Sequence, residues 1–417
     1  MSGDLLDAQA ALERICSRVG PLPHETRAVD AALGRVLRQD VASPADLPPF
    51  DNSAMDGFAL AADGEFVPAG SELPIVGTRA AGDAAVAGGV GAWEIMTGAR
   101  LPQGLDRVVP VERTRRLTAP PRVQLEADVK RGQNVRLRGS DVACGEEVLL
   151  AGTVLAPQHL MLLAALGVAE LAVSARPRVA VLCTGRELVD APGQSLASGE
   201  IRNSNGPFLA ARVPRAGAEL AHAETVGDEI DAFLAALERA QRAGAHVIVS
   251  TGAVSMGRHD FIPQALRRIG AEILLHRIAI RPGKPLLAAR LPDGRLFLGL
   301  PGNPIAVAVG WRFFVEPALR VMLGLAPEQP WRVPLAADQD TRQGLRFHLK
   351  SRLALDAGGR LTVHVLPGQE SYRIRPLAAA NAWVVIPASQ TDTRAGTLVD
   401  VYGLGHLDSP VPDTATR

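Results

Sequence analysis

The feature that most constrains the fold is a stretch of alternating strand-like and helix-like segments between residues 177 and 325. Its apolar runs have no polar alternation, which is typical of strands buried on both faces of a sheet. These runs are 178–183, 246–250, 272–280, 285–291 and 296–300. The segments with helical spacing cover about 206–213, 228–242, 262–269 and 304–323. Buried strands alternating with helices predict a mostly parallel, doubly wound α/β domain.

The remainder of the 417-residue chain is expected to form further domains, because one core rarely serves so long a chain. Short apolar runs divided by Gly and Pro predict β structure before and after the α/β domain. Amphipathic segments at 4–19 and 156–167, and a shorter one near 26–34, predict helices. The predicted fold is a multidomain α/β plus β chain. Its domains are a discontinuous helical or linker domain (1–45 and 144–176), a small β-rich domain (46–143), the α/β domain (177–325) and a C-terminal β-barrel (326–417).

Composition excludes several classes of protein. The formal net charge is zero, which argues against a large nucleic-acid footprint. No apolar stretch approaches the ~18–20 residues of a membrane span. The three cysteines are far apart and odd in number, which favours a reducing compartment over a disulfide framework. These features predict a cytoplasmic protein that binds neither nucleic acid nor membrane.

Three loops follow the expected strands, and each is rich in small and polar residues. Ligands bind beyond the carboxyl ends of strands in such sheets, so these loops are the candidate ligand site. The first loop, CTGREL, offers Thr184, Gly185 and Glu187. A carboxylate just past a strand can bind a ligand, but position alone favours an ordinary helix-start role for Glu187.

The second loop, STGAVSMGRHD, is unusually long and polar for a connector. Gly252 lets the backbone approach a ligand, and Ser250, Thr251 and Ser255 offer hydroxyl donors. The expected helix start after the loop favours an anion. Asp260 is a candidate metal ligand, with capping of that helix as the alternative. We therefore interpret this loop as functional.

The third loop, LPGNP, and the nearby turn RPGKP complete the candidate phosphate site. Asn303 suits an N-cap and Pro304 the first helical position, so a well-made helix start explains both. The same start offers N–H groups to a phosphate. Arg281 and Lys284 lie in the turn, and Lys284 is one of three lysines among 44 basic residues. A solvated turn is the alternative for these two cations.

Polar residues in four other places are ambiguous by themselves. DNSAMDG carries Asp56, IMTGARLPQG carries Thr97, and RGSD carries Asp141. Turn chemistry alone explains each of these three. Asp228 precedes an expected helix, and an N-cap is its favoured interpretation. No dinucleotide-binding or Walker A motif is present.

Eight segments together resemble the MoeA-type molybdopterin molybdenumtransferase family, which includes the E domain of gephyrin. The segments are PPFDNSAMDGFA, IMTGARLPQGLDRVV, NVRLRGSDV, LAALGVAELAV, VLCTGREL, STGAVSMGRHD, AIRPGKP and GLPGNPIAV. They cover nearly the whole chain in the family's order and approximate spacing. One alone would mean little, whereas eight in order are highly specific.

The resemblance implies an Mg²⁺-dependent transferase that inserts molybdenum from molybdate into adenylylated molybdopterin and releases AMP. It also implies a homodimer, in which the α/β domain of one subunit faces the small β domain of the other. Transient contacts with other proteins of molybdenum cofactor biosynthesis are expected. Two alternatives remain: adenylylation of molybdopterin, and a scaffold paralogue that binds the cofactor without chemistry.

The resemblance also implies roles for particular residues. Catalytic roles fall to Asp56, Thr97, Asp141, Glu187 and Asp260. The metal ligands would be Glu187, Asp228 and Asp260. The residues implied to hold the pterin, its phosphates or molybdate are Thr184, Gly185, Ser250, Thr251, Gly252, Ser255, Arg277, Arg281, Lys284, Pro301, Asn303, Pro304, Gln369 and Ser371.

The chain departs from the family pattern at several of these loops. Ala253 stands where the family has glycine, and its methyl group is costly if φ is positive there. Arg186 replaces an acidic residue, and Tyr372 replaces a small one. Arg277 and Arg281 stand where lysines are common. These departures concern ligand fit more than reaction class.

Overall fold

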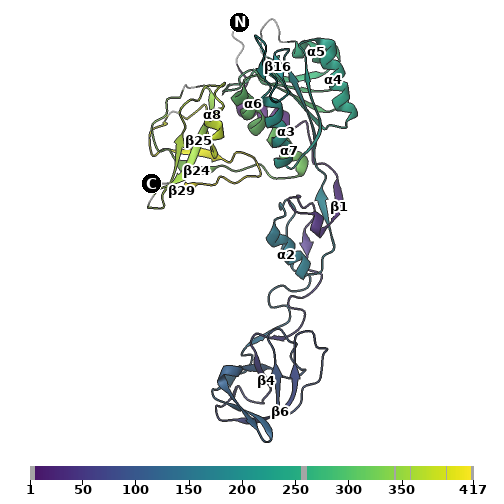
Figure 1. Ribbon diagram of the computed structural model, residues 1–417, viewed down its shortest axis with the longest axis vertical. Helices are drawn as coiled ribbons and strands as arrows, with labels where there is room; N and C mark the ends of the chain where they lie inside the picture. Colours follow the sequence, from purple (N-terminus) through teal and green to yellow (C-terminus); the bar gives the residue numbers. More distant parts are fainter. Residues whose placement is uncertain (1–4, 255–260, 342–343, 357, 391, 415–417) are drawn as a thin grey trace. The chain divides into compact units, whose positions relative to one another are not determined.

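Figure 1 shows the computed structural model of the chain, which describes residues 5–254, 261–341, 344–356, 358–390 and 392–414. The chain forms two compact units. Unit 1 comprises Met1–Glu25, Gly34–Arg38 and Val173–Arg417, and unit 2 comprises Thr26–Leu33 and Gln39–Ala172. The finer division into four domains stays a prediction. In the described ranges, every helix is too short or too polar to span a bilayer.

Unit 1 contains the predicted α/β domain, built on a six-stranded sheet. The strands in spatial order are β18 (Glu219–Val226), β15 (Arg178–Thr184), β19 (Val247–Thr251), β23 (Leu296–Leu300), β22 (Leu287–Arg290) and β20 (Glu272–His276). The first four are parallel, and β22 and β20 are antiparallel additions. The expected mostly parallel sheet is therefore confirmed.

Both faces of this sheet are covered by helices, which explains the unbroken apolar runs. Along β15, Val179, Val181 and Cys183 enter one core, and Ala180 and Leu182 enter the other. Figure 1 shows helices on the two sides of the sheet. Helices α4 (Ile230–Arg242) and α5 (Ile262–Arg268) pack on one core, whereas α1 (Ala8–Cys16), α3 (Asn205–Arg215), α6 (Pro304–Gly310) and α7 (Glu316–Leu323) pack on the other.

Two features of unit 1 differ from the expected elements. The sequence does not single out β18, because this edge strand is polar and only Val226 in it is buried. The long helix expected over 304–323 is interrupted by a π-helical turn, Trp311–Val315, between α6 and α7. Such turns occur mostly as single bulges and often at functional sites.

A seven-stranded sheet occupies the region where the sequence predicts a C-terminal barrel. Its path is β21 (Ile280–Arg281), β25 (Arg346–Leu355), β27 (Ala382–Ile386), β28 (Leu398–Tyr402) and β24 (Trp331–Pro334), while β26 (Leu361–Val365) and β29 (Asp413–Thr414) pair with β25. A bridge between Leu335 and Val363 makes the sheet curl. Trp383 and Val385 join the core of the α/β helices, so the two parts of unit 1 pack as one body.

Unit 2 holds the predicted small β-rich region and a short helix. Its six-stranded sheet has the order β8 (Arg107–Pro110), β4 (Gly57–Leu60), β7 (Ala92–Ile95), β6 (Glu72–Arg79), β10 (Pro121–Leu125) and β9 (Thr114–Thr118). Helix α2 spans Pro157–Ala165, close to the expected 156–167. The helix expected near 26–34 is wrong: β1 (His24–Ala28) leads into a 3₁₀ turn, Val29–Ala31, whose first N–H donates to Ala169 O at 3.0 Å.

Candidate functional site

A cavity of about 1070 Å³ opens at the carboxyl ends of β15, β19 and β23. This is the edge at which open α/β sheets bind ligands. Nine predicted site residues line it, namely Thr184, Gly185, Glu187, Asp228, Thr251, Gly252, Pro301, Asn303 and Pro304. The three loops singled out in the sequence therefore meet in one place.

The first loop brings Glu187 to the cavity, and the loop after β18 brings Asp228. Gly185 has φ +147°, and a Cβ there would lie 2.6 Å from Glu187 Oε1, so the carboxylate folds back over the glycine. The helix-start interpretation of Glu187 is wrong, because the loop leads into a strand, β16 (Leu188–Val189). The N-cap interpretation of Asp228 is also wrong. Residue Glu229 occupies that position in α4, and Asp228 instead accepts the Arg186 N–H at 3.3 Å.

The second loop is bonded to both of its neighbours. The Thr184 hydroxyl donates to Thr251 O at 2.9 Å, and the Gly252 N–H donates to Leu300 O at 3.0 Å. Gly252 has φ +91°, and a Cβ there would lie 2.7 Å from Thr184 O. No other residue fits without displacing the first loop. These bonds hold the three loops in a fixed arrangement.

Ala253 follows directly in the left-handed region, with φ +51°. The methyl group at this departure from the family pattern is therefore strained, as the sequence analysis anticipated. Ser255 and Asp260, the other predicted residues of this loop, lie outside the described residues. Ser250 is fully buried, and its hydroxyl has no hydrogen-bond partner among the described residues.

The third loop begins α6 at Pro304, with Asn303 at the N-cap position but without a side-chain capping bond. Its Ile305 N–H donates to Ser371 O at 3.0 Å, so this predicted anion donor is already used. The Asn205 amide donates to Gly302 O at 2.8 Å and ties α3 to the loop. The Ser371 contact brings a loop of the curled sheet, with exposed Tyr372, to the rim of the cavity.

Several predicted ligand-binding residues do not line the cavity as the structure describes it. They are Ser250, Arg277, Arg281, Lys284, Gln369 and Ser371. Arg281 instead lies over the Phe347 ring, 5.9 Å from its centroid. The Gln369 amide bonds to the backbone of Lys350 and Leu366, close to the loop that carries Tyr372.

The cations that line the cavity are Arg186 and Arg202, which the sequence analysis did not select as ligands. Arg202 lies on β17 (Ile201–Arg202), and its guanidinium donates to Ala191 O at 3.0 Å. Asn205 was missed as well. The run Asn203-Ser-Asn-Gly before α3 was the available signal, since polar helix starts bind anions.

Unit 2 carries the remaining predicted residues. The Asp56 carboxylate accepts the Thr97 N–H at 2.6 Å and the Thr97 hydroxyl at 2.8 Å. These two bonds lower the pKa of Asp56, because they favour its charged form. Asp141 is exposed in a turn, and its backbone N–H donates to Leu47 O at 2.9 Å. Asp56 and Thr97 thus form a pair that the sequence placed in separate turns.

Among the described residues, no group of three His, Cys, Asp or Glu side chains could hold a metal ion. Glu187 and Asp228 nevertheless line the same cavity. Carboxylate oxygens are the type of ligand that Mg²⁺ takes from proteins, and the ion keeps several waters beside a few such ligands. The third predicted ligand, Asp260, lies outside the described ranges.

Comparison with known proteins identifies the family. Residues 6–167 match the MoeA N-terminal region (domain I and II), residues 180–321 a probable molybdopterin binding domain, and residues 332–404 the MoeA C-terminal region (domain IV). The chain is 37% identical to the molybdopterin molybdenumtransferase of Synechococcus elongatus over 96% of this chain and 100% of that protein. It is 37% identical to molybdopterin molybdenumtransferase 2 of Mycobacterium tuberculosis over 89% of this chain and 93% of that protein.

A solved structure has the same fold. The molybdopterin biosynthesis MoeA protein of Pyrococcus horikoshii superposes with a TM-score of 0.81, at 27% identity, over 95% of this chain and 99% of that one. The sequence motifs, the strand-end cavity and these relatives agree. The chain belongs to the MoeA family of molybdopterin molybdenumtransferases.

Proposed function

We propose that this chain inserts molybdenum from molybdate into adenylylated molybdopterin and releases AMP, with Mg²⁺ bound beside the anhydride. The observation that carries the proposal is the cavity that Gly185, Gly252, Glu187 and Asp228 line together. Backbone without side chains can approach phosphate oxygens closely, and two carboxylates can hold a hard cation. The names of the near-full-length relatives support the same substrates.

The proposed roles follow from position and charge. Glu187 and Asp228 hold Mg²⁺, with Asp260 as the third proposed ligand. The ion, when bound, screens the charge of the phosphoanhydride. Arg186 and Arg202 offset the anionic oxygens of pterin phosphate or molybdate. Tyr372, at the rim, offers a ring face on which the pterin or the adenine can stack.

The other half of the proposed site comes from a second subunit. Asp56 of the partner subunit, held by Thr97 of the partner subunit, would face the cavity together with Asp141 of the partner subunit. The resemblance implies this arrangement in a homodimer.

The three described cysteines are unpaired, which agrees with a cytoplasmic location for the reaction.

The decisive experiment supplies adenylylated molybdopterin, molybdate and Mg²⁺ to the purified protein and measures AMP. We expect release that requires molybdate and stops when EDTA removes the metal. AMP release that does not depend on molybdate would refute the insertion reaction. In a second reaction, supplied with ATP and molybdopterin instead, formation of the adenylylated product would identify an adenylyltransferase. Ligand binding without turnover in either reaction would identify a scaffold.

A mixing experiment tests the shared site. Glu187→Gln and Asp56→Asn are each expected to be inactive, because each breaks both sites of a homodimer. Mixed and allowed to exchange subunits, they form heterodimers with one intact site, so about a quarter of wild-type activity should return. Recovery of no activity at all, with exchange verified by a mass tag, would place both residues in the same subunit's site.

A further inference from the structure

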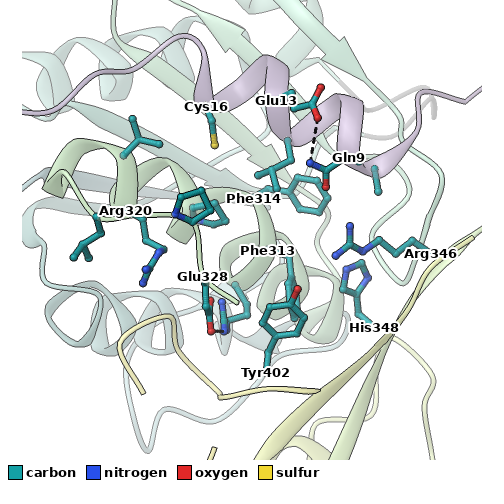
Figure 2. A pocket seen from close by; sticks show the side chains of 17 residues that line it. Gln9, Glu13, Cys16, Phe313, Phe314, Arg320, Glu328, Arg346, His348 and Tyr402 are labelled. Carbon is teal, nitrogen blue, oxygen red and sulfur yellow. Dashed lines mark hydrogen bonds and ion pairs between the residues drawn. The ribbon is translucent and has the colours of Figure 1, made fainter. Parts of the chain in front are cut away.

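Unit 1 contains a second cavity, of about 270 Å³, which shares no lining residue with the strand-end cavity. Figure 2 shows its three walls: helix α1, the π-helical turn with α7, and strands of the curled sheet. Leu12, Phe313, Phe314 and Tyr402 give it a mainly apolar and aromatic surface. The volume exceeds the ~150 Å³ of a cavity that holds benzene. A ring with a short side chain would therefore fit.

A buried histidine without partners lies in the wall. His348 is only 1% exposed, and neither Nδ1 nor Nε2 has a hydrogen-bond partner among the described residues. Its ring lies 4.5 Å from that of Phe313, centroid to centroid, on the cavity surface. Burial and the nearby Arg346 lower the pKa of His348, so the ring is neutral, with one donor and one acceptor nitrogen. Unsatisfied buried polar groups are rare and costly.

Arg346 supplies a cation beside this ring, at the start of β25 (Figure 2). Its buried Nε–H has no hydrogen-bond partner among the described residues. The other two guanidinium groups of the cavity already have partners, and one of these, Glu328, is itself a lining residue. Arg312 bonds to Glu328 at 2.6 Å and to Gly403 O at 3.0 Å, and Arg320 bonds to Ala326 O and His406 O. Arg346 and His348 therefore lie together in the lining, and each has a buried nitrogen without a partner among the described residues.

The helix itself is deformed at this cavity. The π-helical turn Trp311–Val315 inserts an extra residue per turn and places the consecutive Phe313 and Phe314 side chains in the same lining. Phe313 also contacts Tyr402 edge-on, with ring centroids 5.5 Å apart. A regular α-helix would direct two consecutive side chains about 100° apart. The bulge thus contributes to an aromatic wall.

We propose that this cavity binds a small aromatic carboxylate. The ring would pack against Phe313, Phe314 and Tyr402, and the carboxylate would pair with the Arg346 guanidinium beside the His348 ring. A carboxylate only accepts hydrogen bonds, which suits the guanidinium, a group with donors and no acceptor. The proposal is independent of the transferase reaction, because no residue of the strand-end cavity takes part.

The test uses phenylacetate and its neutral counterpart phenylacetamide, titrated into the full-length protein by calorimetry. We expect saturable one-to-one binding of phenylacetate. Phenylacetamide and the variant Arg346→Gln should each weaken binding at least about tenfold, because each removes a charge-assisted hydrogen bond. Arg352→Gln is the matched control. It lies on the same strand, is exposed, and pairs with Asp413 away from the cavity, so binding should not change.

A second variant guards against a folding defect in Arg346→Gln. Leu12→Trp, on α1, fills the cavity from the opposite wall without changing a charge, and it should abolish binding. The proposal is overturned if phenylacetate does not saturate, if acid and amide bind equally, or if Leu12→Trp binds as well as the wild type. Unchanged AMP release in Leu12→Trp would further separate this site from the proposed transferase site.

Discussion

The strand-end cavity and the aromatic cavity of unit 1 are made in different ways. The strand-end cavity is formed by loops that directly follow strands, and its shape depends on backbone at Gly185 and Gly252. The second cavity is formed by large side chains from α1, the π-helical turn and the curled sheet. The first is about 1070 Å³ and polar at its loops, while the second is about 270 Å³ and aromatic.

The difference shows what each cavity can tolerate. A cavity made of backbone loses its shape when a glycine gains a side chain, whereas its charged side chains can change with less effect on the fold. A cavity made of aromatic side chains depends on packing, and its few polar groups must stay neutral or paired. Substitutions that change only the backbone shape, only a charge, or only a protonation equilibrium can therefore test this difference between the two cavities.

The largest expected effect is on turnover at the strand-end cavity. Glu187→Gln removes one of two carboxylates proposed to hold Mg²⁺, and AMP release should fall about 100-fold or more. The fold should remain, as circular dichroism can check. The control Glu238→Gln removes an exposed carboxylate on α4 that pairs with Arg242, and turnover should not change. If Glu187→Gln kept most of its activity, the carboxylate would have no role in turnover.

Backbone shape is tested by Gly252→Ala. The new Cβ would lie 2.7 Å from Thr184 O at a positive φ, so we expect a loss of about 3 kcal/mol in the free energy of unfolding. Gly270→Ala is the matched control, since its φ is +76° but nothing lies within 4 Å of the new Cβ. It should cost only about 1 kcal/mol in denaturant titration. Equal losses of unfolding free energy in the two variants would show that the contact between Gly252 and Thr184 O leaves room for a methyl group.

The same contrast explains what could be predicted of the fold. β15, β19 and β23 were found because nearly every residue in them is buried, so each contains an unbroken apolar run. β18 was missed because an edge strand needs few apolar residues. The π-helical turn has no sequence signature, since buried apolar residues such as Phe313 and Phe314 are equally compatible with a regular helix. The sequence pattern therefore located the central strands but not the polar edge strand β18 or the distortion of the helix.

The residues of the candidate sites also differ in whether a local sequence signal could have identified them. Thr, Gly and Asn after a strand are local signals, so the three loops of the first cavity could be selected from the sequence. Tyr372 and Arg202 reach its lining through tertiary contacts, such as that of Ile305 N–H with Ser371 O. The second cavity joins Leu12 to His348 across most of the chain. No pattern in either segment predicts that contact.

A buried histidine, His406, bonds to Arg320 beside the second cavity and stays neutral in the folded protein. Burial lowers the pKa of His406 to about 3, and its neutral ring bonds to Ala216 O and Arg320. Between pH 6 and about 4 the unfolded chain binds a proton that the folded chain does not. The free energy of unfolding therefore decreases as the pH is lowered through this range. The slope from this group is at most about 1.4 kcal/mol per pH unit.

His406→Gln should therefore flatten the acid side of the stability profile, measured by chemical denaturation at each pH. The raised pKa of the buried Glu316 acts in the opposite direction but is common to both proteins, so it cancels in the comparison. His24→Gln, at an exposed position, should leave the slope unchanged. Equal slopes in the wild type and His406→Gln would mean that His406 is protonated in the folded state.

The smallest expected effect is a gain of stability at the rim of the first cavity. Ala253 is held at φ +51°, where an alanine costs about 1–2 kcal/mol more than it does in a right-handed helix. Ala253→Gly removes that strain and loses part of the gain to chain entropy, so the free energy of unfolding should rise by about 1 kcal/mol. In the control Ala232→Gly, at an exposed position of α4, the free energy of unfolding should fall by a similar amount, because glycine is a poor helix former. If Ala253→Gly lost stability as Ala232→Gly does, the left-handed conformation at residue 253 would carry no strain. Alanine in place of the family's glycine would then leave the shape of the cavity unchanged.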